Sequence, residues 1–166
     1  DGQVIRYGLA AIKGVGEAAV EAMLTARDKG GPFTSLSNFC ERVELRAVNR
    51  KVLEALIKAG ACDCFGQTRA SLTAQIERTL ARAASNAADI ASGQETLFGM
   101  LEKSSEVDKI PAALQDLPEW PDNEKLANEK ELLGFYVSGH PLTPLLGILD
   151  NYALHKSTNL KELPDR

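Results

Sequence analysis

IKGVGEAAVEAML, residues 12–24, places two glycines around a single valine, directly before an apolar helical pattern. Val20, Met23 and Leu24 recur at the i, i+3 and i+4 spacing that marks one face of a helix. Helical spacing also precedes the glycines, over residues 9–12. Because glycine readily adopts backbone conformations that other residues avoid, we predict a sharp bend between two short helices.

A second pair of helices with a short turn is predicted to follow. Ser35 can cap a helix whose apolar stripe is formed by Leu36, Phe39, Cys40 and Val43. The turn LRAVN, residues 45–49, leads into a helix that ends at Gly60 and has one apolar side, formed by Val52, Leu53, Leu56 and Ile57. We therefore predict helix, turn and helix twice within residues 1–66, as a weak internal duplication.

The next two segments differ in composition. Residues 67–91 are rich in alanine and place Leu72, Ile76 and Leu80 at every fourth position, which predicts one long helix with a narrow apolar seam. Residues 92–121 mix glycine, serine, proline and charge. Such a composition buries little apolar surface, so we predict a flexible tether there.

Residues 122–166 are predicted to form two further helices. The first helix begins near Asn123, carries Leu126, Leu133 and Val137 on one stripe, and ends at the sequence SGHP, residues 138–141. The second begins at about Thr143. With the preceding segments, this makes an all-α fold: tandem helix pairs, a long helix, a flexible tether and two further helices.

Composition favours the same fold class and bounds the setting of the protein. Hydrophobic residues make up 44% of the chain and aromatic residues only 5%, which favours helices packed through small aliphatic side chains. No apolar run reaches the roughly 20 residues that cross a bilayer, and no secretory signal is present. We expect a soluble, cytoplasmic protein without a membrane partner. Because the chain begins with Asp1, we expect it to be a piece of a longer protein.

The net charge of −4 is distributed unevenly along the chain. Residues 1–70 contain 10 Lys and Arg against 8 Asp and Glu, whereas residues 71–166 contain 9 against 15. Only the first part therefore suits a phosphate-bearing partner. Since its excess is slight, we expect any such contact to depend on local geometry rather than on a broad positive field.

Residues that carry catalysis or bind metal are not recognisable in the pattern. Cys40, Cys62 and Cys64 lack the paired CxxC spacing of a zinc site and are interpreted as small apolar side chains in a reducing compartment. Asp63 and Asp150 have no partners at suitable spacing and are interpreted as solvated surface groups. We therefore predict no catalytic residue, no metal site and no cofactor in this chain.

The glycine bend allows three interpretations. GVGEAA fits the permissive GxGxxA pattern of dinucleotide binding, but the strands that this fold requires are absent from the pattern. A simple helix connector is the second interpretation. The third is a phosphate-binding bend, because free N–H groups and the positive dipole end of a helix start attract phosphate, and Lys13 adds a charge.

The second turn points to an anion through an apparent misplacement of cations. Asn49 is a good N-cap, yet Arg50 and Lys51 then occupy the first helical turn, where the helix dipole disfavours positive charge. With Arg46 close by in the sequence, a phosphate is a natural partner. A solvated basic patch remains the alternative, because surface charge is common and costs little.

Four segments together resemble the alpha subunits of bacterial DNA polymerase III, from about Ile5 to the end of the chain: IRYGLAAIKGVGEAAVEAML, GGPFTSLSNFCERVE, NRKVLEALIKAGACD and GFYVSGHPL. The resemblance implies a tandem helix-hairpin-helix over residues 1–66, with a connection toward an oligonucleotide-binding fold. It also implies that the bends hold duplex DNA behind the polymerase centre. The DNA-binding residues would be Lys13, Gly14, Val15, Gly16, Arg46, Asn49, Arg50 and Lys51.

The same resemblance implies partners and a cofactor for the whole protein. This family polymerises DNA with magnesium bound by aspartates, and no run in this chain matches that aspartate motif. Polymerase chemistry and magnesium are therefore expected of the parent protein, together with other replicase subunits as partners.

QETLF, residues 94–98, resembles the short peptide with which this family binds the ring-shaped sliding clamp. Two apolar side chains can enter a pocket while a glutamine amide orients the peptide. The clamp-binding residues would be Gln94, Thr96, Leu97 and Phe98. Alternatively, Leu97 and Phe98 fold back onto a helix of this same chain.

Two other functions remain open at this point. The chain can be a helical protein–protein scaffold without DNA contact, or the helix-hairpin-helix module of a DNA repair enzyme. Neither His140 nor Trp120 decides between them. We interpret His140 as part of a helix stop, and Trp120 as docking the end of the tether onto the helices.

Overall fold

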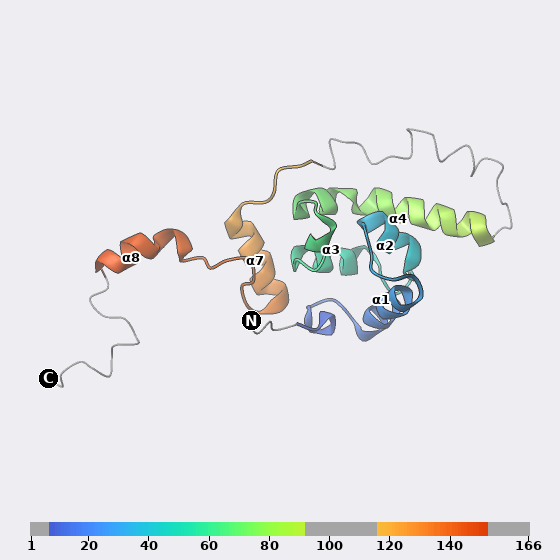
Figure 1. The fold of residues 1–166 in the computed structure, drawn as a ribbon, viewed down its shortest axis with the longest axis horizontal. Helices are drawn as coiled ribbons and strands as arrows, with labels where there is room; N and C mark the ends of the chain where they lie inside the picture. The colour runs from blue at the N-terminus through green and yellow to red at the C-terminus, as the bar shows by residue number, and fades with distance from the viewer. Residues whose placement is uncertain (1–6, 92–115, 153–166) are drawn as a thin grey trace.

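The computed structural model describes residues 7–91 and 116–152, and within these two ranges every regular element is a helix (Figure 1). The predicted all-α fold class is thus confirmed. Helices α1 to α4 form one packed bundle, and α7 lies against it beside α3. None of the described helices is both long and apolar enough to cross a membrane.

The first helix pair consists of η1 (Leu9–Ala11), a 3-10 helix, and α1 (Glu17–Gly30). α1 buries Ala19, Met23 and Ala26, and ends at Gly31, whose φ of 74° few other residues adopt. The predicted apolar face was partly wrong, because Leu24 is 41% exposed. Ala19 and Ala26 lie on the buried face beside Met23 instead.

The second helix pair follows the predicted caps. α2 (Leu36–Arg42) begins after Ser35, whose Oγ accepts the amide of Asn38 at 3.1 Å. α3 (Arg50–Lys58) begins after Asn49, whose Oδ1 accepts the amide of Val52 at 3.2 Å. Both N-caps are therefore confirmed. The chain turns after α3 through Gly60, which has a φ of 83°, as the sequence predicted.

Arg42, which the sequence analysis did not single out, fixes the loop between α1 and α2. Its Nη2 donates to the carbonyls of Ala26 at 2.8 Å and Gly31 at 2.7 Å. The guanidinium also lies 4.6 Å from the centre of the Phe33 ring. A Cβ added at Gly30, the last residue of α1, would come within 2.7 Å of the Arg42 guanidinium, so a larger residue there would displace this side chain from its position.

The long helix α4 (Arg69–Ala91) follows the short 3-10 helix η2 (Asp63–Phe65). Leu72 and Ile76 are fully buried and Leu80 packs at the edge of the core, which confirms the predicted seam. α4 contacts both α2 and α3, so it joins the two helices in one core.

Residues 116–121, which the sequence analysis assigned to the tether, dock on the start of α4. The Glu119 carboxylate accepts the backbone amides of Arg69 at 3.0 Å and Ala70 at 3.3 Å. Leu117 donates its amide to the Ser71 hydroxyl at 2.9 Å. Amides of a first helical turn lack partners within the helix, so Glu119 supplies a cap from 50 residues away.

The last part of the described chain contains α7 (Asp122–Leu133), the 3-10 helix η5 (Thr143–Leu145) and α8 (Leu146–Tyr152). α7 ends at Gly134, which has a φ of 83°, so the predicted extension to Val137 was wrong. Val137 is 61% exposed and lies outside the helix. The next helical segment begins at Thr143, as predicted, and α8 lies apart from the bundle in Figure 1.

Candidate nucleic-acid interface

The first bend is anchored in the core by its valine and exposed at its glycines. Val15 is 5% exposed and donates its amide to the Ile12 carbonyl at 3.0 Å. Gly14 has a φ of 90°, which strongly favours glycine, and a Cβ built there would lie 3.9 Å from that of Ala55 on α3. The bend therefore rests on α3 while Gly14 and Gly16 face outward.

Backbone amides at this bend point to a possible anion site. Gly16 is the N-cap of α1, but its missing side chain leaves the helix start uncapped. The amides of Gly14, Gly16, Glu17 and Ala18 have no acceptor among the described residues, and all four residues are exposed. Free N–H groups together with the positive end of a 14-residue helix favour an anion at this position.

The second bend is also anchored by a buried valine, but it has fewer free amides. Val48 is fully buried and donates its amide to the Glu44 carbonyl at 3.0 Å, which anchors the turn. Asn49 occupies one amide of α3, that of Val52. The amides of Arg50 and Lys51 have no acceptor in the part of the chain that the structure describes.

The cations around the two bends differ in their partners. Arg50 donates to Glu54 at 2.7 Å and also pairs with Glu77, and the hydrogen bond to Glu54, followed by the charge of Glu77, raises the pKa of Arg50. The two carboxylates therefore offset the unfavourable interaction of Arg50 with the helix dipole. The sequence alone had suggested a phosphate for this role. Lys13 approaches Glu131 at 3.9 Å, with both side chains mostly exposed.

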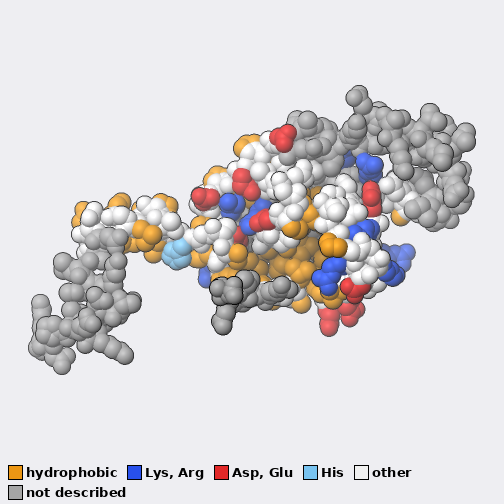
Figure 2. All heavy atoms as spheres, viewed as in Figure 1, with side chains coloured by type: hydrophobic (Ala, Val, Ile, Leu, Met, Phe, Trp, Pro, Cys, Tyr) orange, Lys and Arg blue, Asp and Glu red, His pale blue; other side chains and the backbone are white. Residues whose placement is uncertain are grey.

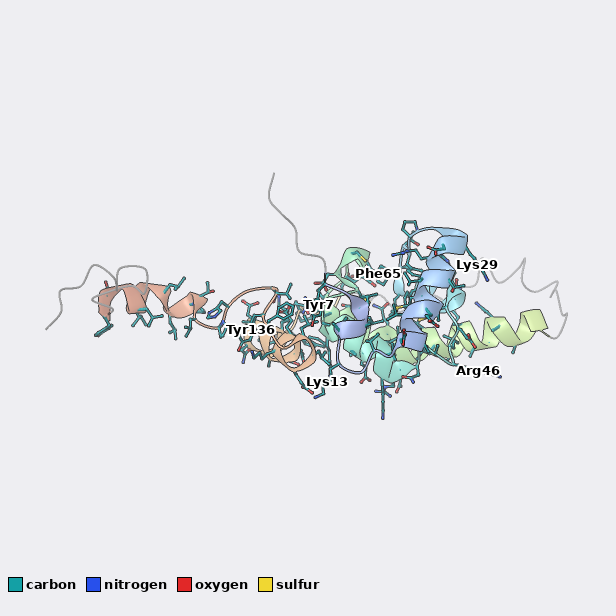
Figure 3. All side chains as sticks on the ribbon, turned by 90° about the horizontal axis from the view of Figure 1, so that it is seen from below. Tyr7, Lys13, Lys29, Arg46, Phe65 and Tyr136 are labelled. Atoms are coloured by element: carbon teal, nitrogen blue, oxygen red, sulfur yellow. The ribbon has the colours of Figure 1, made fainter. Side chains whose placement is uncertain are left out.

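Lys51 and Arg46 form no ion pair with any described residue, and both are exposed. Lys13 and Arg46 lie along the same lower edge of the molecule in Figure 3, whereas Lys29 lies farther up. On the face shown in Figure 2, basic and acidic side chains are interspersed. A phosphate contact would therefore rely on the amides and a few cations rather than on a broad positive field.

A buried ion pair joins α4 to α7, and sequence reasoning missed it. Arg69 is 4% exposed and donates to Glu129 at 2.9 Å and to Asp63 at 2.8 and 3.0 Å. Asp63 is half-exposed, as expected of a solvated group, but the expectation that it has no partner was wrong. The second Glu129 oxygen accepts the amides of Val137 at 2.7 Å and Ser138 at 2.9 Å, so part of GFYVSGHPL closes this network.

His140 and the buried cysteines have surroundings that indicate structural roles. His140 accepts the Leu142 amide on Nδ1 at 3.2 Å and stacks edge-on against Tyr136. Cys40 and Cys62 are buried thiols, and burial raises the pKa of each to about 12. Among the described residues no group of three or more His, Cys, Asp or Glu is placed to hold a metal ion. The predicted clamp-binding residues Gln94, Thr96, Leu97 and Phe98 lie outside the described residues.

Comparison of the sequence with known proteins indicates the family of the chain. Residues 1–72 match the family of the helix-hairpin-helix motif. The DNA polymerase III subunit alpha of Neisseria meningitidis serogroup A is 46% identical over 157 residues, which cover 95% of this chain and 13% of that protein. The proteins of the same name from Pasteurella multocida and Escherichia coli K12 are 41% and 40% identical, over 98% and 92% of this chain.

The matched segment is a small part of these relatives. The chain spans 13–14% of their length, while the similarity extends over nearly all of this chain. The motif match covers both bends, since it reaches from residue 1 to residue 72. The chain therefore belongs to the DNA polymerase III subunit alpha family, of which it matches one segment that includes the helix-hairpin-helix motif.

Proposed function

We propose that the two bends bind the sugar-phosphate backbone of duplex DNA as a non-catalytic part of a replicative DNA polymerase. The observation that carries this proposal is the uncapped start of α1, where exposed amides at Gly16, Glu17 and Ala18 lack acceptors among the described residues. A phosphate oxygen supplies the acceptor that such a helix start lacks. Contacts of this kind position a duplex without reading its sequence.

The second bend supports the same proposal with side-chain charge. Asn49 already caps α3, so the bend offers only the two amides of Arg50 and Lys51, with Arg46 nearby in the sequence. Since Arg50 is paired with Glu54 and Glu77, Lys51 and Arg46 are the cations most available to a phosphate. Val15 would act only through the shape of the first bend, because its side chain is buried.

The rest of the activity is proposed for the whole protein. The relatives are named as DNA polymerase III alpha subunits, and this chain matches about one seventh of their length. DNA synthesis with aspartate-bound magnesium, contacts with other replicase subunits and a cytoplasmic location are proposed on that basis. No aspartate motif of the polymerase type occurs in this chain, so its residues would not hold that magnesium.

We expect Lys51→Ala to weaken duplex binding by about 3- to 10-fold, independently of DNA sequence. Arg50→Ala is expected to have a smaller effect, because Glu54 and Glu77 already neutralise that guanidinium. Fluorescence anisotropy with two duplexes of unrelated sequence, at about 50 and 200 mM salt, measures both effects. Phosphate contact also predicts a steep loss of affinity as salt rises.

Lys29→Ala is the matched control, because Lys29 is exposed on α1 and lies away from the lower edge in Figure 3. An equal loss for Lys29→Ala and Lys51→Ala would mean that only net charge matters. Loss confined to one of the two duplexes would contradict phosphate recognition. Absence of binding even at low salt would favour a protein–protein scaffold instead.

We also propose that QETLF binds the sliding clamp of the replicase, on the strength of its resemblance to the clamp-binding peptide of this family. Leu97→Ala combined with Phe98→Ala is expected to weaken clamp binding by at least about 10-fold, because apolar anchors dominate such short peptides. Surface plasmon resonance with the immobilised clamp measures this loss. Attachment to a ring around DNA would keep the polymerase at a high local concentration near the primer end.

Circular dichroism separates this proposal from the alternative in which the two side chains pack inside the chain. Unchanged helix content and thermal midpoint in the double variant support a peptide that is free to bind the clamp. A large fall in the midpoint would show that Leu97 and Phe98 contribute to the core. Glu95→Ala serves as the control, since Glu95 lies in the same peptide but is not among the expected clamp-binding residues.

A further inference from the structure

We propose that α7 is a positioning element for the phosphate-binding bend, although it follows that bend by more than 100 residues. The inference rests on the proposed function, because it assigns to α7 the task of holding the amides of Gly16–Ala18 in their binding geometry. It adds residues that lie outside the helix-hairpin-helix match, which ends at residue 72.

The carbonyl end of α7 meets the first bend directly. The backbone amide of Lys13 donates to the carbonyl of Leu132 at 2.9 Å. The carbonyls of a last helical turn have no partners within the helix, so α7 offers an acceptor at this end. Tyr7, just before η1, donates its hydroxyl to the Leu133 carbonyl at 3.4 Å and packs edge-on against Phe135 at 4.9 Å.

These contacts fix which amides of the bend face outward. Lys13 points its amide toward α7, and Val15 points its side chain into the core. Between and after these two fixed points, Gly14 and Gly16 are exposed. A bend held at both residues has little freedom to rotate its remaining N–H groups, so the orientation of the anion site depends on where α7 ends.

The position of α7 is itself secured at two places. Glu129 on α7 is fully buried and pairs with Arg69 on α4, which ties the helix to the bundle. Gly134 then ends α7 with a φ of 83°, directly after the two carbonyls that accept from Lys13 and Tyr7. The buried pair sets the location of the helix, and the glycine sets the location of its last carbonyls.

Gly134→Ala tests the inference through backbone strain at the end of α7. A Cβ at Gly134 meets nothing within 4 Å, so the substitution adds strain at positive φ without a steric clash. We expect duplex affinity of the full 166-residue chain to fall by about 3- to 10-fold, which lies within the range of coupling that connected residues produce. Fluorescence anisotropy at low salt gives the affinity.

Gly66→Ala is the matched control. Gly66 has a φ of 73°, and a Cβ there also meets nothing within 4 Å, but this residue follows η2, outside α7 and both bends. The two variants are expected to lose similar thermal stability, whereas only Gly134→Ala loses duplex affinity by more than about 2-fold. Equal affinities for the two variants, with wild-type binding intact, would overturn the positioning role and leave the proposed function standing.

Hydrogen exchange provides a second measurement that a general loss of stability does not reproduce. The Lys13 amide is expected to exchange at least about 10-fold faster in Gly134→Ala than in Gly66→Ala, while the α3 amides stay equally protected in both. A loss of affinity without faster exchange at Lys13 would contradict the inference. A wild-type chain that binds no duplex at low salt would overturn both the inference and the proposed function.

Discussion

Glu129→Ala is expected to lower the free energy of unfolding by about 3 kcal/mol, the low end of the range for breaking a buried ion pair. The substitution leaves Arg69 buried with Asp63 as its remaining carboxylate partner. It also removes the acceptor for the amides of Val137 and Ser138. Urea unfolding at neutral pH, followed by circular dichroism, measures the change.

Glu131→Ala is the control for charge and helix propensity on the same helix. Its side chain is 68% exposed and approaches Lys13 only at 3.9 Å. We expect its free energy of unfolding to stay within about 0.5 kcal/mol of the wild type. If Glu129→Ala were equally harmless, the pair with Arg69 would be solvated in solution, and α7 would not be tied to α4 as described.

The same carboxylate predicts a loss of stability in acid. Burial alone would raise the pKa of Glu129, but the amides of Ser138 and Val137 and the Arg69 guanidinium outweigh burial and lower it below 4.5. A pKa lowered by folding stabilises the folded state above about pH 4.5, and this contribution is lost as the pH falls through the folded-state pKa. Glu129→Gln should therefore reduce the dependence of unfolding free energy on pH as the pH falls below about 5.

The parts of the fold that the sequence predicted correctly depend on neighbouring residues. Ser35 and Asn49 cap the helices that follow them, and the chain turns at Gly60 after α3. Each of these is decided within one helical turn, where capping rules apply with few competing influences. The first bend follows the same logic, since Gly14 adopts the positive φ that two glycines around a valine suggested.

The elements that were missed join residues far apart in the chain. Glu129 and Arg69 are 60 residues apart, and Glu119 caps α4 from a similar distance, so spacing in the sequence gave no signal for either. Arg50 has one partner that is near in the sequence and one that is distant. Glu54 lies at i+4 and could have been recognised as a helix pair, whereas Glu77 is 27 residues away.

The end of α7 was misplaced although a signal was present. SGHP, residues 138–141, predicted the helix stop, while Gly134 stands earlier, at the start of GFYVSGHPL. A glycine just after a periodic apolar stretch is itself a common helix end. That signal predicts that the last α7 carbonyls lie near residue 133. Their contact with Lys13 joins residues far apart in the chain, so no local pattern predicts it.

Gly16→Asp is expected to lower duplex affinity by about 10-fold or more while raising stability, which separates binding from folding. Gly16 has the extended φ and ψ of an N-cap, −80° and 163°, and a Cβ there meets nothing within 4 Å. An aspartate can therefore accept the amide of Ala18, the second residue of α1, and complement the helix dipole, for a gain of about 0.5 kcal/mol. That amide is one of those that the phosphate would use.

Gly16→Ser separates occupation of the amides from repulsion by charge. Its hydroxyl can cap α1 in the same way without adding a negative charge, so its affinity should lie between those of the wild type and Gly16→Asp. Thermal melts and anisotropy titrations on the same samples give both quantities. Unchanged duplex affinity in a stabilised Gly16→Asp variant would show that phosphate does not use the start of α1, because the aspartate occupies the Ala18 amide and its negative charge repels a phosphate there.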